Sequence, residues 1–222
     1  RREFLPLPNC ACDTGRSRSL DHSYVDRSLE DALGRAERAI DDQLGIVQEI
    51  GEAESFPVPY YLAHSCDTAG FSDVSAARDA AGVDAGWDAA FMKALGESLE
   101  RYCAGVYHLE EFKSAPPNGI QNAVSPSAFV CQTDQDPTAD ISWVVGEDLS
   151  TGQSVPLPAE FVHYPPPSRQ YRPPVTTGLG LGNSGTEALL AGLYEVIERD
   201  ATMLSWYSTF DPLALDIEDD GY

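Results

Sequence analysis

Two long stretches of the chain repeat apolar residues at helical spacing. In Asp88–Val106 these residues recur every three or four positions, which predicts an amphipathic α-helix. In Ser184–Trp206 the pattern starts at a residue that can cap a helix, and it predicts a second long helix. A shorter helix is predicted over residues 28–43, because Ser28 can cap it and apolar residues again follow the helical period.

Short apolar runs between turn residues predict the β-strands. Ile46–Ile50 and Val58–Leu62 flank the turn-like segment Gly51–Pro57. Residues 66–86 carry no clear period, so we assign no element to them. Strands and helices mix without regular β-α-β alternation, and the expected fold class is therefore α+β, with mixed or antiparallel sheets and long acidic helices. Further strands are expected at Ala128–Cys131, Ile141–Gly146 and Ser154–Leu157.

The periodic segments begin only after the first two dozen residues. Residues 1–25 scatter Pro, Gly, Arg and Ser without a sustained period, which is typical of a linker from an upstream region. Because the first residue is Arg1, we interpret the chain as an internal piece of a longer protein. No apolar run approaches the ~18 residues of a membrane-spanning helix, so no membrane segment is expected.

The net charge narrows the classes of partner. The chain holds 36 Asp and Glu against 14 Lys and Arg, for a formal net charge of −22, and its only lysines are Lys93 and Lys113. Such a surface repels phosphate backbones and anionic lipids, which argues against a nucleic-acid-binding or membrane-binding protein. We interpret the evenly spread acids as halophilic adaptation, with an ordinary acidic protein as the alternative. Five cysteines without a disulfide pattern favour a reduced, cytoplasmic protein.

A glycine-rich segment precedes the last predicted helix. Residues 180–185 (GLGNSG) match the G-x-G-x-x-G spacing of a dinucleotide-binding turn. The residues before it make a poor central strand, and the long helix after it leaves no place for a second strand ending in a ribose-binding acid. The match is therefore weak, and a nicotinamide enzyme is only a remote alternative.

The last predicted helix carries an acidic face. Three carboxylates and one amide fall within an arc of about 120° when each residue turns the helix by about 100°. Carboxylates gathered beside a core favour a bound cation, and Mg²⁺ prefers such oxygen ligands. The polar positions are Asn183, Glu187, Glu195 and Glu198. The adjoining apolar stripe, which we expect to border the core, consists of Leu190, Leu193, Ile197 and Leu204.

Two structural interpretations compete with a metal site on this helix. Ser184 and Glu187 have the spacing of a capping box, which would give Glu187 a purely structural task. Glu195 and Arg199 lie four residues apart, as in the ion pairs of solvated helix faces. The spacing alone leaves both interpretations open.

The earlier long helix repeats the acidic motif. The pattern E-x-x-E-R occurs as Glu97–Arg101 and again as Glu195–Arg199. If the two helices lie together, four carboxylates and two arginines meet at one site. Triphosphate chemistry uses such a set, because carboxylates hold Mg²⁺, Mg²⁺ bridges phosphate oxygens and Arg neutralises developing charge. No Walker A motif is present, so an ATP site here would be of a different kind.

Two segments of this chain resemble the YcaO family. One is Lys93–Tyr102 (KALGESLERY), and the other is Thr177–Ala188 (TGLGLGNSGTEA) continued by Tyr194–Ala201 (YEVIERDA). Weaker similarity extends over residues 25–215 and is closest to the cyclodehydratases that make azoles in ribosomal peptides. The resemblance implies an α+β fold and the use of Mg-ATP to phosphorylate a backbone amide oxygen of a precursor peptide. A neighbouring Cys, Ser or Thr then attacks the carbonyl carbon, and phosphate leaves in place of water.

The resemblance also implies which residues form the site. The residues expected to hold Mg²⁺ are Glu97, Glu100, Glu187, Glu195 and Glu198. Those expected to contact ATP are Asn183, Glu187, Arg199 and Arg101. Residues 26–222 would form the N-terminal portion of the domain, with the catalytic groups beyond Tyr222. This piece alone is therefore expected to be inactive.

The chain departs from the family pattern at one point. Many members carry Gly-Lys-Gly upstream of the first acidic helix, whereas this chain has Ala80–Val83 (AAGV) without a lysine. Two alternatives to azole formation are a thioamide-forming enzyme with a sulfur-delivering partner and a non-catalytic scaffold that binds peptide or ATP. The resemblance also implies a leader-peptide-binding partner protein and a homodimer.

Overall fold

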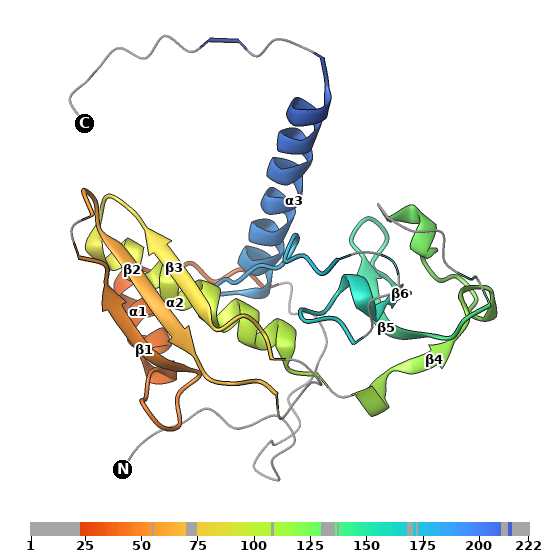
Figure 1. Cartoon of the computed structure of the whole chain (residues 1–222), viewed down its shortest axis with the longest axis horizontal. Coiled ribbons are helices and arrows are strands. Elements are labelled where there is room, and N and C mark those ends of the chain that lie inside the picture. The colour runs from red at the N-terminus through yellow and green to blue at the C-terminus, as the bar shows by residue number, and fades with distance from the viewer. Residues whose placement is uncertain are drawn as a thin grey trace.

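The fold comes from a computed structural model of the 222-residue chain. The structure describes residues 23–54, 56–69, 75–107, 109–129, 136, 138–167, 171, 173–209 and 213–214. The predicted linker therefore lies outside the described residues except for its last three positions. Figure 1 shows two small antiparallel sheets, with the long helix α3 rising between them.

The first sheet contains two predicted strands and one that the sequence did not reveal. It has the order β1-β2-β3, with all neighbours antiparallel. The strands β1 (Val47–Glu52) and β2 (Tyr60–Ser65) lie close to the predicted ranges. The third, β3 (Asp79–Val83), falls in the segment to which we assigned no element. Its inward residues are Ala80 and Gly82, and such small side chains give no apolar signal.

Helix α2 (Trp87–Gly105) covers the inner face of this sheet and makes the main core. Its prediction over Asp88–Val106 is confirmed to within one residue at each end. Leu95 and Ala94 are fully buried against Val47 and Ala63 of the sheet. Helix and sheet approach closely because Gly82 has no side chain, and a Cβ there would overlap the backbone of α2.

Helix α1 (Leu29–Ala36) is shorter than predicted. Its capping is confirmed, because the Ser28 hydroxyl accepts the Asp31 N–H at 3.2 Å. The helix tightens into a 3₁₀ turn over Glu37–Ala39, and the chain then becomes extended at Ile40. Ile40 forms a bridge with Val47 of β1, so tertiary pairing ends the helix before the periodic pattern ends.

The second sheet is also antiparallel, with the order β4-β5-β6. The strands β5 (Ile141–Asp148) and β6 (Gln153–Pro158) confirm two predictions, and the short β4 (Lys113–Ala115) was not predicted. The strand expected at Ala128–Cys131 is wrong at its start, because Ala128 ends a 3₁₀ turn capped by the Ser125 hydroxyl. Residues 130 and 131 lie outside the described residues. Further 3₁₀ turns span Leu109–Glu111, Pro117–Gly119 and Ala159–Phe161.

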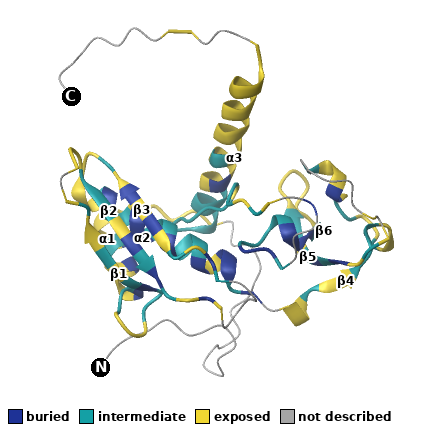
Figure 2. Ribbon diagram, viewed as in Figure 1, coloured by how far each residue is buried: buried dark blue, intermediate teal, exposed yellow. Residues whose placement is uncertain are grey.

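Helix α3 (Gly185–Tyr207) begins at the predicted cap Ser184 and extends one residue beyond the predicted end. Among its residues only Gly192 is buried, and Figure 2 shows most of the helix in the colour of exposed residues. The expectation that its apolar stripe borders the core is therefore wrong for the described structure. No described element packs over this stripe, and Leu190, Leu193, Ile197 and Leu204 are 41% to 61% exposed.

The architecture as a whole confirms the predicted α+β class with antiparallel sheets. The two longest helices are the ones that carry the E-x-x-E-R motifs. In the described part of the chain, every helix is too short or too polar to cross a membrane.

Candidate functional site

The two E-x-x-E-R motifs meet where α2 and α3 come together. Glu100 of α2 is half-buried, and burial raises the pKa of its carboxyl group. The neighbouring charge of Glu195 from α3 raises this pKa further, as does that of Glu97, while Arg101 opposes them. Glu97 and Glu195, one from each helix, thus both lie within electrostatic reach of Glu100. The structure brings together the two segments that are farthest apart in the predicted site.

Glu97 and Arg101 lie on the side of α2 that faces β3. One Glu97 oxygen accepts the Ala81 N–H at 2.8 Å, and the other contacts the Arg101 guanidinium at 2.5 Å. Arg101 also donates to the Asp79 carbonyl oxygen of β3. Both charged side chains are therefore engaged with the strand, and they position α2 along it.

Glu187 lies in the first turn of α3 and takes part in capping the N-terminus of this helix. Its N–H donates to the Ser184 hydroxyl at 3.3 Å, and its carboxylate accepts the Asn183 N–H at 2.7 Å. This closely follows the capping-box interpretation, although the carboxylate reaches one residue before the cap. The predicted site residues Asn183 and Glu187 are thus in direct contact, through the Asn183 N–H and the Glu187 carboxylate.

Glu195 and Arg199 form the ion pair that their spacing allowed. The Arg199 guanidinium donates through two nitrogens to one Glu195 oxygen, at 2.9 and 3.1 Å. The second oxygen accepts the Gly178 N–H at 2.8 Å. Glu195 therefore ties the glycine-rich segment to the middle of α3.

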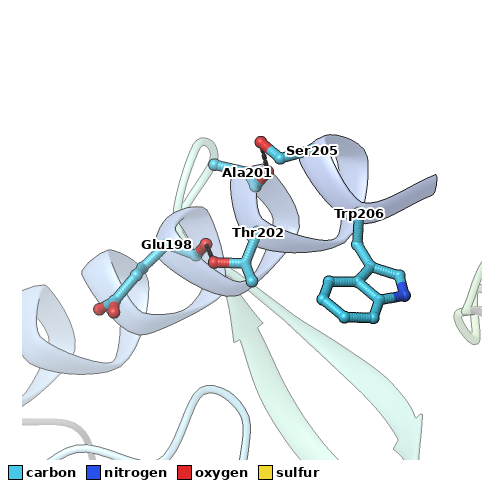
Figure 3. Close-up of a pocket in the computed structure, with 5 residues that line it drawn as sticks. All are labelled: Glu198, Ala201, Thr202, Ser205 and Trp206. Carbon is cyan, nitrogen blue, oxygen red and sulfur yellow. Dashed lines mark hydrogen bonds between the residues drawn. The ribbon is translucent and has the colours of Figure 1, made fainter. Parts of the chain in front are cut away.

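Glu198 lies one turn further along α3, on its exposed side. Figure 3 shows its carboxylate pointing away from the helix, while its backbone oxygen accepts the Thr202 hydroxyl. Glu198 lines one end of an open groove that also includes Ala201, Thr202, Ser205 and Trp206. Of the five predicted metal-binding glutamates, Glu198 is the one that is exposed, whereas the other four are partly buried.

Three of the predicted carboxylates share one arrangement. Glu97, Glu187 and Glu195 each accept a backbone N–H from outside their own helix, at Ala81, Asn183 and Gly178 respectively. Within the described residues, no three His, Cys, Asp or Glu side chains converge closely enough to hold a metal ion. The carboxylate oxygens of these glutamates are nevertheless the kind of ligand that Mg²⁺ prefers. A cation bound beside Glu100 would neutralise the negative charges of Glu195 and Glu97 that act on it.

The glycine-rich segment lies along the first half of α3. A Cβ at Gly180 or Gly182 would overlap the α3 backbone near Ala188, and one at Gly192 would press on the Gly178 carbonyl. The glycines therefore allow the connecting segment to approach the helix closely. This packing differs from the dinucleotide-binding turn that their spacing resembled.

Sequence reasoning missed the part that β3 plays in this site. Lys93 of α2 donates to the Val83 carbonyl oxygen at 3.1 Å and pairs with Asp84 at 2.8 Å. Lys93 precedes Glu97 by four residues, so the sequence did place both residues on the same face of the predicted helix. The contacts of that face could not be predicted, because no sequence pattern revealed β3.

Comparison with protein-family models identifies the family. Residues 81–222 match the YcaO model, described as YcaO cyclodehydratase, ATP- and Mg²⁺-binding. This range is more than half of the chain, so the chain belongs to the YcaO family. The family identification from the two motifs is confirmed, and the expected cofactors agree with the description of the family.

Similar proteins extend beyond this chain. An uncharacterised protein of Methanothermobacter thermautotrophicus is 33% identical over 120 residues, which are 50% of this chain and 30% of that protein. The structure of a heterocyclase in complex with substrate and cofactor superposes with a TM-score of 0.69 and 20% identity, over 86% of this chain and 31% of that one.

A second solved structure covers more of its own length. YcaO from Methanopyrus kandleri, bound with AMPPCP and Mg²⁺, superposes with a TM-score of 0.68 and 23% identity. The match covers 91% of this chain and 52% of that one. These likenesses establish the shared fold. The chain spans about half of this structure and less than a third of the heterocyclase and of the M. thermautotrophicus relative.

Proposed function

We propose that this chain contributes the Mg-ATP site of an enzyme that activates backbone amides of a ribosomally made peptide, leading to azoline formation. The observation that carries the proposal is the position of Glu100, which is half-buried and within reach of the charges of Glu195 and Glu97, so that burial and both charges raise its pKa. A divalent cation would offset the repulsion between these charges. Family membership adds the ATP and Mg²⁺ of the family description.

The proposal gives each predicted site residue a task. Bound Mg²⁺ would supply charge neutralisation between the carboxylates and the phosphate oxygens of ATP. Asn183, Arg199 and Arg101 would contact the nucleotide, since an amide and two guanidinium groups suit phosphate oxygens. The carboxylates that would hold the cations are Glu97, Glu100, Glu187, Glu195 and Glu198.

The proposed reaction balances without a further reagent. The amide oxygen attacks the γ-phosphorus of ATP, and ADP leaves. A neighbouring Cys, Ser or Thr side chain then bonds to the amide carbon and loses its proton. The amide nitrogen also gives up its proton, the C–O bond breaks as the C=N bond of the azoline forms, and the former amide oxygen departs as part of inorganic phosphate. The peptide thereby loses one water for each ring formed, and one ATP becomes ADP and phosphate.

Mass spectrometry of the peptide tests this proposal. The full-length natural protein is incubated with Mg-ATP and the peptide encoded beside it, and ATP consumption is measured in parallel. Loss of one water per site with matching ATP consumption supports azoline formation. Oxygen-for-sulfur exchange that requires a sulfur donor would instead assign thioamide formation. An unmodified peptide with unspent ATP, from folded protein, overturns the proposal in favour of a scaffold.

Glu198→Gln is the sharpest variant for the carboxylates, because its side chain is exposed and the change should spare the fold. Outer-shell partners of metal ligands are worth about 10- to 100-fold, so loss of a direct ligand is expected to lower ATP-dependent modification by more than ~100-fold. Asp200→Asn, two residues along the same exposed helix, is the matched control and should keep wild-type rates. Equal rates in both variants would remove Glu198 from the site.

A further inference from the structure

The strand β3 has a free edge within the described structure. It is the last strand of the first sheet and pairs only with β2. The Ser65 N–H donates to the Arg78 carbonyl, so alternate residues from Arg78 onward face β2. The backbone groups of Asp79, Ala81 and Val83 consequently point to the open edge. An open edge of this kind is a template for strand addition unless something covers it.

Three side chains of α2 cover this edge, and we call them the edge latch: Lys93, Glu97 and Arg101. Lys93 donates to the Val83 carbonyl, Glu97 accepts the Ala81 N–H, and Arg101 donates to the Asp79 carbonyl. The three residues are spaced by four positions, so they form one stripe along the helix. Each binds a successive outward-facing residue of β3.

Glu97 is the central residue of the latch, and it also belongs to the acidic cluster. Its two oxygens are both used, by the Ala81 N–H and by Arg101. Glu100, three residues later, lies close enough for the Glu97 charge to raise its pKa. The Glu97 side chain is 35% exposed, so it has room to turn from the strand toward Glu100.

We infer that Glu97 is a switch: when a divalent cation of Mg-ATP takes its carboxylate, the latch releases Ala81 and the middle of the β3 edge opens. The inference rests on the proposed function. Mg²⁺ demands near-ideal octahedral geometry and short bonds to oxygen, so the cation rather than the strand would fix the position of the carboxylate. The same charge would displace Arg101 from Glu97, which frees the guanidinium for phosphate. Cofactor loading would thus expose a strand edge beside the site.

Hydrogen exchange at the Ala81 amide tests the switch without any measurement of activity. The full-length protein is compared with and without saturating Mg-ATP, whose binding is followed separately by calorimetry. Loss of a charge-assisted hydrogen bond predicts faster Ala81 exchange, by about tenfold. The amide of Ala80, which faces β2, serves as the internal control and should not change. Unchanged or slower Ala81 exchange with Mg-ATP bound overturns the switch.

Two variants of Glu97 separate the latch from the cation site. Glu97→Gln keeps a carbonyl oxygen for the Ala81 N–H but loses the charge, so Ala81 should stay protected and should not respond to Mg-ATP. In the Glu97→Ala variant the Ala81 amide should exchange rapidly both with and without Mg-ATP. Lys93→Ala leaves the carboxylate in place, and its Ala81 amide should still respond to Mg-ATP.

The outcomes also separate this inference from the proposed function. If Mg-ATP does not bind the wild-type protein, the proposed function fails and the cation-driven switch fails with it. The latch is then judged without nucleotide. Wild-type protection of Ala81 in the Glu97→Ala variant would overturn it, whereas fast exchange would keep it as a device that closes the strand edge. Binding of Mg-ATP without any response at Ala81 rejects the switch alone.

Discussion

Helices α2 and α3 carry the same E-x-x-E-R motif in very different surroundings. In α2 the motif lies between the first sheet and α3, and seven residues of the helix are buried. In α3 only Gly192 is buried. Glu97 and Arg101 bind the backbone of β3, whereas the side-chain bonds of Arg199 within the described residues go to the neighbouring Glu195. The same five-residue pattern therefore ties α2 to β3 and leaves the corresponding arginine of α3 in a more exposed pair with Glu195.

This difference shows that a sequence motif identifies the functional groups present but does not predict the partners that each side chain binds. Glu97 and Glu195 occupy equivalent positions in the two motifs, and each accepts a backbone N–H from a neighbouring segment. The segment at Glu97 is a strand of the sheet, while that at Glu195 is a glycine-rich connection along α3 itself. Matched substitutions in the two helices can measure how much this context contributes.

The largest difference in stability between matched variants is expected at the leucines that lie two residues before each motif. Leu95 in α2 is 0% exposed, and Leu193 in α3 is 46% exposed. Leu95→Ala removes fully buried methyl groups and leaves a cavity, so it should lower the free energy of unfolding by about 2–5 kcal/mol. Leu193→Ala should cost less than about 1 kcal/mol, as is usual for exposed positions. Urea unfolding of the 222-residue chain measures both values.

The outcome for Leu193 is informative in either direction. A small cost agrees with an α3 that is exposed along this stripe. A cost equal to that of Leu95→Ala would contradict the comparison, because it would show that α3 is covered in solution.

The losses of stability on replacing Arg101 and Arg199, the arginines of the two motifs, should differ by less than those of the two leucines. Arg101→Met keeps the aliphatic stem but removes the bonds to Asp79 and Glu97, and hydrogen bonds of charged groups contribute about 1–3 kcal/mol. Arg199→Met breaks only an exposed pair, which is worth about 0.3–0.5 kcal/mol. Thermal unfolding of both variants checks the order. Equal losses of stability would mean that Arg101 does not hold β3.

The sequence predicted the long elements well, because their signals are local. The 3.6-residue period located α2 and α3, and Ser184 marked the start of α3. It missed β3, since Ala80 and Gly82 face the core with almost no side chain and are selected by the close approach of α2. The two motifs also identified the family, whose description includes ATP and Mg²⁺. The engagement of Glu97 with Ala81 could not be predicted, because it joins residues through a strand that no local pattern announced.

The smallest expected effect concerns the charge of Glu100. Burial and the Glu195 charge raise the pKa of Glu100 above its usual value of 4.5, so the folded state disfavours its ionised form. For a carboxyl group with a raised folded pKa, stability is lost as pH rises from the unfolded pKa through the folded pKa, and it stays lower above that window. Glu100→Gln removes this penalty and should raise the Tm at pH 7 by about 1–3 °C.

Differential scanning calorimetry between pH 4 and pH 8 checks this prediction. Because the raised pKa of Glu100 penalises only its ionised form, the difference between wild type and Glu100→Gln should shrink as pH falls toward 4. Glu198→Gln, on the exposed side of α3, is the matched control and should leave the Tm unchanged throughout. A Tm that falls in Glu100→Gln at neutral pH would show that the charge is already compensated. The cluster at the junction of α2 and α3 would then lack the repulsion that favours a bound cation.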